Sequence, residues 1–212
     1  MHPSILGAKY DRIARWWHER HAASGYGVAQ VERALAFASG AGRALDVGCG
    51  AGGRIVRLLE KTGYAVTGID VSREMIRLAR ENHPGHRFLH QDICSWQGGE
   101  SFDFIVAWDS LFHLPLDRQR PVLAQLCGLL ASGGVLIYTF GDAEGEHTDQ
   151  WHDDTFYYSS IGINENLRQL MGNGLSVLHL ELDQHPEPHV YVIARRPGQD
   201  DRPNYADSGS LR

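Results

Sequence analysis

Residues 44–53 read Ala44-Leu45-Asp46-Val47-Gly48-Cys49-Gly50-Ala51-Gly52-Gly53. An apolar strand ends here in an acidic residue, glycines follow at alternate positions, and a helix is expected directly afterwards. Glycines let the backbone turn sharply and approach a ligand without an intervening Cβ. The helix N-terminus behind them offers unpaired N–H groups and partial positive charge. The pattern predicts a ligand-binding loop after the first strand of an open α/β sheet.

An acidic residue also ends the next apolar segment. Asp70 closes the segment Val66-Thr67-Gly68-Ile69-Asp70, twenty residues after Gly50. A carboxylate there can accept both hydroxyls of an adenosine ribose, whichever adenosine cofactor is bound. The glycines at 48, 50 and 53 also satisfy the dinucleotide fingerprint G-x-G-x-x-G. The loop and Asp70 therefore indicate an adenosine-containing cofactor and do not separate a nicotinamide dinucleotide from the others.

Short apolar segments alternate with helical patterns along most of the chain, which implies parallel strands joined by right-handed crossovers. Only residues 183–188 separate the last two segments, too few for a crossover helix, so the final strand is expected to run antiparallel. We predict an α/β, Rossmann-like fold with a seven-stranded sheet, six parallel strands and one antiparallel final strand, and helices on both faces. The predicted strands span residues 43–47, 65–70, 87–89, 104–108, 135–140, 176–182 and 189–194.

The parts outside this alternation suggest the domain organisation. Residues 1–40 are helical in character and carry several aromatic side chains, so we expect a helical N-terminal lid. Residues 41–196 form the core, with an insertion at 141–163 that is too long for a connector and is expected to be a functional loop. Residues 197–212 are polar without apolar periodicity and are expected to be disordered.

The composition limits the partners. Of the 212 residues, 42% are hydrophobic and 22% charged, as in an ordinary globular protein. The net charge of −6 and the lack of a basic run argue against nucleic acid, because phosphate neutralisation supplies most of that affinity. No apolar run or secretion signal points to a membrane. Three cysteines without a CxxC pair fit a reducing compartment, so we expect a cytoplasmic protein, monomeric or homodimeric, that binds a small molecule.

Three further motifs accompany the glycine loop and Asp70. The third strand ends in His90-Gln91-Asp92-Ile93, the fourth runs out into Trp108-Asp109-Ser110-Leu111-Phe112-His113, and Leu129-Leu130-Ala131-Ser132-Gly133-Gly134 precedes the fifth. In this order and spacing the motifs resemble the class I S-adenosylmethionine-dependent methyltransferases, of the small-molecule, methyltransferase domain 25/11-like type. The resemblance covers residues 10–194. It implies a transferase (EC 2.1.1.-) that moves the methyl group of S-adenosyl-L-methionine to a small acceptor and leaves S-adenosyl-L-homocysteine.

The resemblance also implies which residues bind the cofactor. Two pairs would hold its adenosine part: Asp70 takes the ribose hydroxyls while Val71 packs on the adenine, and Asp92 takes the adenine amino group with Ile93 beside it. The glycine loop would face the methionine part, through Asp46, Gly48, Cys49 and Gly50.

Two further groups complete the implied cofactor site. The backbone at the end of the fourth strand, at Ala107 and Trp108, would reach the methionine ammonium group. Tyr10 and Trp16 match the aromatic N-terminal helix that closes over the cofactor in many small-molecule members. Both residues lie in the expected lid.

A sulfonium methyl is already activated by its charge, so transfer requires neither a metal nor a covalent enzyme intermediate. The protein must hold the nucleophile about 3 Å from the methyl carbon and in line with the sulfur. A general base helps only a protonated nucleophile. Asp109 and His113, just after the fourth strand, are the candidate catalytic residues, since an unperturbed histidine titrates near neutrality. A packing role for His113 is an equal alternative.

Substrate selection is expected in the insertion at 141–163. Its aromatic and histidine side chains can wall a planar acceptor, with a solvated loop docked on the core as the alternative. The histidines and acids at 147–154 do not match a standard metal spacing, and we predict no metal site. The predicted substrate-binding residues are Trp151, His152, Phe156, Tyr157 and Tyr158.

Two other functions share parts of this pattern. A nicotinamide-dependent oxidoreductase can use the same glycine loop, although the helical extension, Asp46 and the antiparallel final strand argue against it. A non-catalytic S-adenosylmethionine-binding protein would differ in having a filled substrate pocket. The sequence does not identify the methyl acceptor atom, which can be oxygen, nitrogen, sulfur, carbon or a metalloid, because the same fold hosts all of these.

Overall fold

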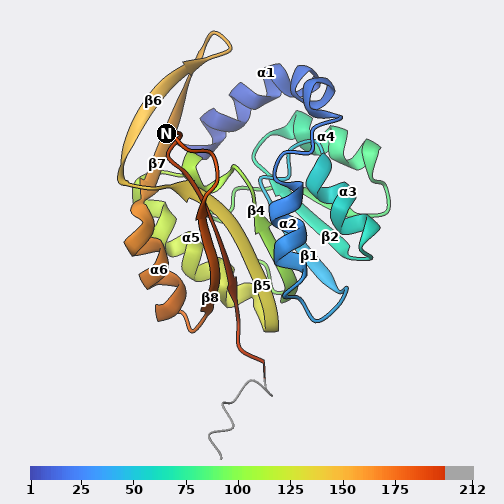
Figure 1. Ribbon diagram of the computed structural model, residues 1–212. Helices are drawn as coiled ribbons and strands as arrows, with labels where there is room; N and C mark the ends of the chain where they lie inside the picture. The colour runs from blue at the N-terminus through green and yellow to red at the C-terminus, as the bar shows by residue number, and fades with distance from the viewer. Residues whose placement is uncertain (199–212) are drawn as a thin grey trace, which may run out of the picture.

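A seven-stranded sheet forms the centre of the computed structural model, which describes residues 1–198 (Figure 1). Its strand order is β3-β2-β1-β4-β5-β9-β8. The expectation of disorder for 197–212 falls almost entirely outside the described residues. The strands are β1 (Arg43–Val47), β2 (Ala65–Asp70), β3 (Arg87–His90), β4 (Phe102–Ala107), β5 (Leu130–Gly141), β8 (Ser176–Leu182) and β9 (His189–Arg195).

The strand directions confirm the predicted sheet. Strands β1 to β5 pair in parallel, and β9 is antiparallel to both of its neighbours, β5 and β8. The reversed strand therefore lies inside the sheet, between β5 and β8. The chain moves outward from β1 to β3 and then returns to β4 on the other side of β1. Such a switch point opens a crevice at the carboxyl ends of β1 and β4.

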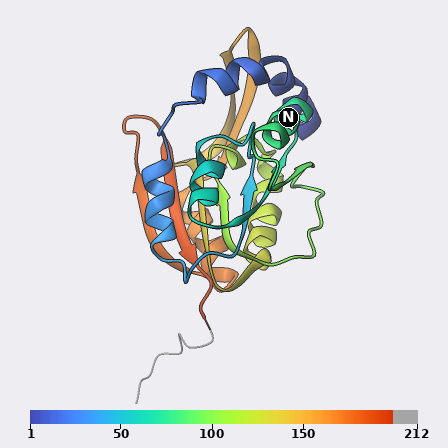
Figure 2. The ribbon, with the colours of Figure 1, turned by 90° about the vertical axis from the view of Figure 1, so that its right-hand side faces the viewer.

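Helices cover both faces of the sheet, as predicted (Figure 2). Side chains of β4 alternate between two cores: Phe104 and Val106 pack with α2, α3 and α4, whereas Ile105 and Ala107 pack with α5 and α6. The helices are α1 (Pro3–His21), α2 (Val28–Leu35), α3 (Arg54–Lys61), α4 (Arg73–Asn82), α5 (Leu116–Leu129) and α6 (Gly162–Gly172), with a 3₁₀ turn at Leu111–His113. Among residues 1–198, none of these helices is long and apolar enough to cross a membrane.

The insertion at 141–163 is a β-hairpin, so the expectation of a loop was wrong. Strand β6 (Glu144–Trp151) pairs antiparallel with β7 (Asp154–Ile161) across a two-residue turn. Both turn residues, His152 and Asp153, have positive φ, as a type I′ turn requires. Strand β6 is largely exposed and its sequence, Glu-Gly-Glu-His-Thr-Asp-Gln-Trp, has no apolar alternation. Pairing with β7, which no local pattern reveals, makes it a strand.

Helix α1 lies across the carboxyl ends of the parallel strands, beside the hairpin (Figure 1). It approaches the segment after β2 very closely at Gly7. A Cβ at that position would lie 2.2 Å from the Val71 carbonyl oxygen, so only glycine permits this packing. Helix α1 and the hairpin together form the cover of the crevice, which we call the roof.

Candidate functional site

A cavity lies under the roof at the carboxyl ends of β1, β2 and β4. The structure brings ten of the twelve predicted cofactor-binding residues to its wall, together with both candidate catalytic residues, Asp109 and His113. Trp16 and Ala107 are not in the lining. The ten are Tyr10, Asp46, Gly48, Cys49, Gly50, Asp70, Val71, Asp92, Ile93 and Trp108.

Backbone bonds fix the glycine loop. The N–H groups of Gly48 and Cys49 both donate to the Ile69 carbonyl, at 2.8 and 3.1 Å. Gly48 has φ of 75°, and a Cβ there would lie 2.4 Å from the Cβ of Ser110. The conformation and the close contact both require glycine at this position. The loop is thereby held against β2 and leaves its inner side open to the cavity.

Asp70 joins the loop to the start of α4. One carboxylate oxygen accepts the N–H of Gly50 at 2.9 Å, and the other accepts the N–H of Ser72 at 2.8 Å. Burial raises the pKa of Asp70, while these two N–H donors oppose that rise. The carboxylate is oriented before any ligand binds, as the sequence motif implies for a ribose-binding acid.

Asp46 is a buried acid that lacks a partner. Its side chain is only 4% exposed, and no described residue donates a hydrogen bond to its carboxylate. Burial raises the pKa of Asp46 to about 7, and the charge of Asp70 adds to this while Arg54 opposes it. An acid in this position favours a cationic ligand, because burying an unpaired charge is costly.

His113 connects the cavity to both elements of the roof. Its Nδ1–H donates to the Tyr157 carbonyl on β7 at 2.9 Å, so Nε2 is the acceptor and takes the Tyr10 hydroxyl of α1 at 3.1 Å. Burial lowers the pKa of His113 to about 4, against the effects of the Tyr157 carbonyl and Asp109. Titration near neutrality was expected only for an unperturbed ring, and burial perturbs His113. A neutral His113 with an occupied Nε2 is a weak base.

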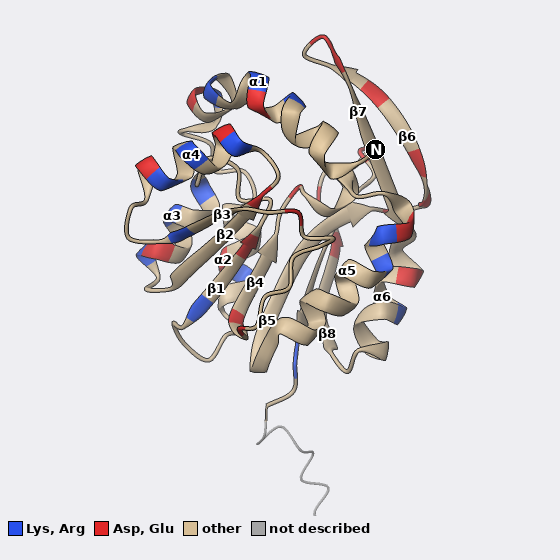
Figure 3. Ribbon diagram, turned by 180° about the vertical axis from the view of Figure 1, so that it is seen from behind, with Lys and Arg blue, Asp and Glu red and all other residues tan. Residues whose placement is uncertain are grey.

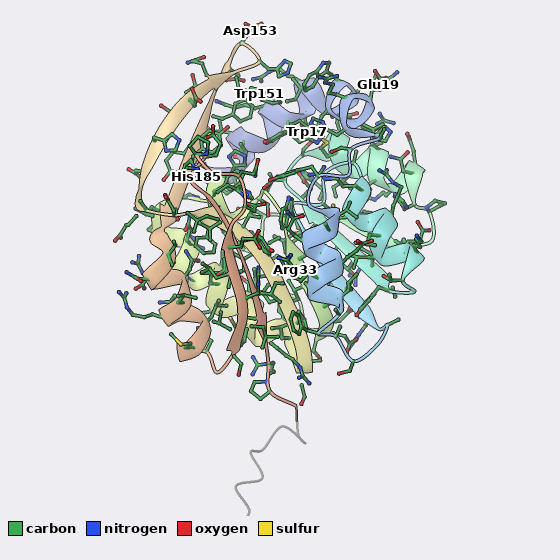
Figure 4. All side chains as sticks on the ribbon, viewed as in Figure 1. Trp17, Glu19, Arg33, Trp151, Asp153 and His185 are labelled. Carbon is green, nitrogen blue, oxygen red and sulfur yellow. The ribbon has the colours of Figure 1, made fainter. Side chains whose placement is uncertain are left out.

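Trp16, one of the two aromatic residues predicted to bind the cofactor from α1, does not line the cavity, whereas the next residue in the sequence does. Trp16 is 40% exposed and its ring lies 3.9 Å from that of His152, whereas its neighbour Trp17 lines the cavity. Figure 4 shows Trp17 and Trp151 facing each other between α1 and the hairpin, and their rings lie 5.6 Å apart. Consecutive side chains of a helix point about 100° apart around its axis. The sequence did not determine which face of α1 turns toward the cavity, so it could not distinguish Trp17 from Trp16.

The five predicted substrate-binding residues belong to the roof and are absent from the cavity lining. Phe156 is buried, and the centroid of its ring lies 5.4 Å from those of the Tyr10 and Trp151 rings. The Tyr157 hydroxyl donates to Glu146 at 2.7 Å, and the Tyr158 ring lies 4.9 Å from that of His113. His152 sits at the hairpin turn. Phe156, Tyr158 and Trp151 contact the lining residues Tyr10, His113 and Trp17, respectively.

Ion pairs and a shared helix cap fasten the roof. Asp154 of β7 binds both Lys9, at 3.0 Å, and Arg12 of α1. The Asp11 carboxylate of α1 accepts the Ser72 hydroxyl at 2.6 Å and the Glu74 N–H at 3.0 Å. A side chain of α1 therefore completes the N-terminal cap of α4.

The structure adds lining residues that sequence reasoning missed. Arg54 follows the glycine loop directly, and its Nε–H donates to the Tyr26 carbonyl while its guanidinium lies 5.1 Å from the Tyr26 ring. Arg57, His18 and His21 also line the cavity, and Arg57 donates to the Ala22 carbonyl at 2.8 Å. The position of Arg54 next to the loop was a usable signal, whereas the α1 histidines required the tertiary structure. Within residues 1–198 no group of His, Cys, Asp or Glu is arranged to hold a metal ion.

The fold and the glycine loop agree with one family. The family model described as a methyltransferase domain matches residues 44–134. The matched segment carries the glycine loop, Asp70 and Asp92, which are motifs by which the sequence resembles the class I S-adenosylmethionine-dependent methyltransferases.

Relatives and solved structures extend this result. Trans-aconitate 2-methyltransferase of Rhodopseudomonas palustris (strain BisA53) is 30% identical over 156 residues, which are 73% of this chain and 56% of that protein. The chain thus spans about half the length of the curated relatives it matches.

Two solved structures have the same fold. The DhpI–SAH complex is 23% identical with a TM-score of 0.69, covering 94% of this chain and 99% of that one. Magnesium protoporphyrin IX methyltransferase (ChlM) from Synechocystis PCC 6803, with bound SAM, is 18% identical with a TM-score of 0.67, covering 92% and 98%.

Proposed function

We propose that this protein is an S-adenosylmethionine-dependent methyltransferase that acts on a small molecule. The buried, unpartnered carboxylate of Asp46 carries the proposal, because it lies beside a glycine loop and a preoriented Asp70 in the same cavity. An adenosine cofactor with a cationic amino-acid part satisfies all three features. A nicotinamide dinucleotide offers no comparable amino group to Asp46.

The chain's own residues divide the binding task. Asp70 and Val71 would hold the ribose and adenine, Asp92 and Ile93 the adenine edge, and Asp46 with the glycine loop the methionine part. Bound S-adenosyl-L-methionine supplies a methyl group that is activated by its positively charged sulfur. The roof residues Tyr10 and Trp17 would exclude water above the cavity, so orientation supplies most of the catalysis.

We propose a carboxylate-bearing acceptor. Arg54 and Arg57, in the first turn of α3, line the cavity and suit an acid, and several curated relatives are named trans-aconitate 2-methyltransferases. A carboxylate is already deprotonated at neutral pH and needs no general base. The depressed pKa of His113 is compatible with such an acceptor.

The remaining partner assignments stay predictions. A nucleic-acid substrate is not expected, and Figure 3 shows acidic and basic residues side by side along α1 and α4. The protein is expected to be a monomer or homodimer and to reside in the cytoplasm.

Calorimetric titration with S-adenosylhomocysteine and with NADH tests the cofactor. We expect binding of S-adenosylhomocysteine only, weakened by about 1–3 kcal/mol in Asp70→Ala, the range for losing a polar contact. Asp103→Ala is the matched control, because Asp103 also accepts a backbone N–H (Arg43, 2.8 Å) but does not line the cavity. Binding of NADH alone would overturn the proposal. Methyl transfer from labelled cofactor to di- and tricarboxylic acids then separates an enzyme from a non-catalytic binding protein.

A further inference from the structure

Asp109 has a positive φ, and among residues 1–198 hydrogen-bond donors contact only one of its two carboxylate oxygens. Its φ of 53° is in the left-handed region, and its N–H donates to Thr139 Oγ1 at 2.8 Å. Three donors converge on Oδ1: His189 Nε2 at 3.0 Å, the Thr139 hydroxyl at 3.4 Å and the Tyr26 hydroxyl at 3.5 Å. No described residue donates to Oδ2, and Asp109 lines the cavity. Non-glycine residues with positive φ are uncommon, and they cluster at functional sites.

His189 lies between two carboxylates. Its Nδ1 is 2.5 Å from Asp183 Oδ1, and its Nε2 is 3.0 Å from Asp109 Oδ1. With both carboxylates ionised, each can only accept hydrogen bonds, so both ring nitrogens carry hydrogen and the ring is an imidazolium; the Tyr26 hydroxyl also lies 3.3 Å from Nε2. Burial lowers the pKa of His189, but the bonds to Asp109 and Asp183 outweigh burial and raise it. The Asp183 side chain is itself only 3% exposed.

The direction of β9 makes this arrangement possible. Because β9 is antiparallel to β5, its first residue, His189, lies at the sheet edge where the parallel strands end. Tyr26 also faces the pair, and its hydroxyl accepts a bond from Gln184 at 2.6 Å while it donates to Asp109. Arg54 of α3, His113 and Tyr10 of α1 are the other charged or titratable groups whose electrostatic interactions include Asp109.

We propose that His189, held by Asp183, is a positioning residue that saturates Oδ1 of Asp109 and directs its Oδ2 to an amino group in the cavity. The inference rests on the proposed function and extends it, because it assigns a second anionic contact besides Asp46. An amino group can come from the amino-acid part of the cofactor or from the acceptor. The proposed carboxylic-acid acceptor favours the cofactor.

The test compares S-adenosylhomocysteine with 5′-methylthioadenosine, which lacks the amino-acid part. Asp109→Asn is expected to weaken S-adenosylhomocysteine binding about 10- to 100-fold, the range for a charged hydrogen bond, and to leave 5′-methylthioadenosine unchanged. His189→Leu should show the same selectivity at about 10-fold, and His189→Gln, which keeps a donor, should recover most of it. His185→Gln is the control, because His185 is exposed on the loop between β8 and β9 (Figure 4).

Nitrogen NMR of labelled histidines gives a readout that a packing role would not move. Both nitrogens of His189 should show imidazolium shifts at neutral pH, and Asp183→Asn should convert the ring to a neutral tautomer. Equal losses for both ligands, or a neutral His189 in the wild type, would overturn the inference. Unchanged S-adenosylhomocysteine binding together with a raised acceptor KM in Asp109→Asn would assign the amino group to the acceptor. Failure of the wild type to bind either nucleoside would instead refute the proposed function.

Discussion

Two parts of the cavity are held by different kinds of contact: the roof, and the glycine loop with Asp70, which we call the floor. Backbone N–H groups fix the floor, where Gly48 and Cys49 bond Ile69 and Gly50 bonds Asp70. Side chains fix the roof, through Asp154 with Lys9 and Arg12 and through aromatic rings such as Trp17 and Trp151. Backbone geometry is encoded by a short local motif, whereas side-chain contacts depend on partners far apart in the chain. The floor should therefore be rigid and intolerant of change, and the roof should be adaptable.

Asp46→Asn gives the largest expected effect on the floor. The pKa of Asp46 is about 7 when folded against 3.8 ordinarily, so ionisation destabilises the ligand-free protein as pH rises from about 4 through 7. This shift of about 3 pH units corresponds to at most about 4 kcal/mol. The variant should unfold at higher denaturant concentration than the wild type at pH 8 and equally at pH 4. It should also bind S-adenosylhomocysteine more weakly. A variant that shows neither the higher stability at pH 8 nor the weaker binding would contradict the role of Asp46 as a buried acid that contacts the cofactor.

His113→Gln examines the connection between floor and roof. The folded pKa of about 4 lies below the ordinary 6.5, so the folded wild type resists protonation and loses stability as pH falls from about 6.5 to 4. The loss amounts to about 3 kcal/mol at the acid end. Urea titrations at pH 7 and pH 4 should show a smaller decline for the variant. Identical declines would mean that His113 is solvated.

Gly48→Ala tests whether the floor tolerates a single methyl group. The positive φ and the 2.4 Å approach to Ser110 predict a loss of about 1–3 kcal/mol in unfolding free energy. S-adenosylhomocysteine affinity should fall with it, as calorimetry can measure. Gly128→Ala in α5 is the control, since a Cβ there meets nothing within 4 Å. Normal binding by Gly48→Ala would show that the loop adapts.

Asp154→Asn gives the smallest effect and sharpens the contrast. The Asp154 and Lys9 side chains are partly buried, whereas Arg12 is 61% exposed. Ion pairs at the protein surface contribute little to global stability, so the melting temperature should change little. The hairpin amides of 144–161 should nevertheless exchange faster with solvent, because the bonds to Lys9 and Arg12 tie them to α1. A large drop in melting temperature would show that roof and floor unfold together.

This contrast explains which features the sequence could predict. The strands, the glycine loop, Asp70 and Asp92 were predictable because each follows from a local pattern. Strand β6 was not, because its polar residues become a strand only by pairing with β7. The choice of Trp17 over Trp16 depends on how α1 is rotated against the core. His189 reaches Asp109 only because β9 is reversed and lies next to β5.

The Asp11 cap makes α1 and α4 thermodynamically dependent on one another. The first turn of α4 loses two hydrogen bonds whenever α1 lifts away, because Asp11 bonds Ser72 and Glu74. Linkage is reciprocal, so a ligand that holds α1 down must also protect the Glu74 amide, although that amide lies outside the cavity lining. The two helices thus form one cooperative unit, and slower hydrogen exchange of the Glu74 amide should report that the cavity is occupied.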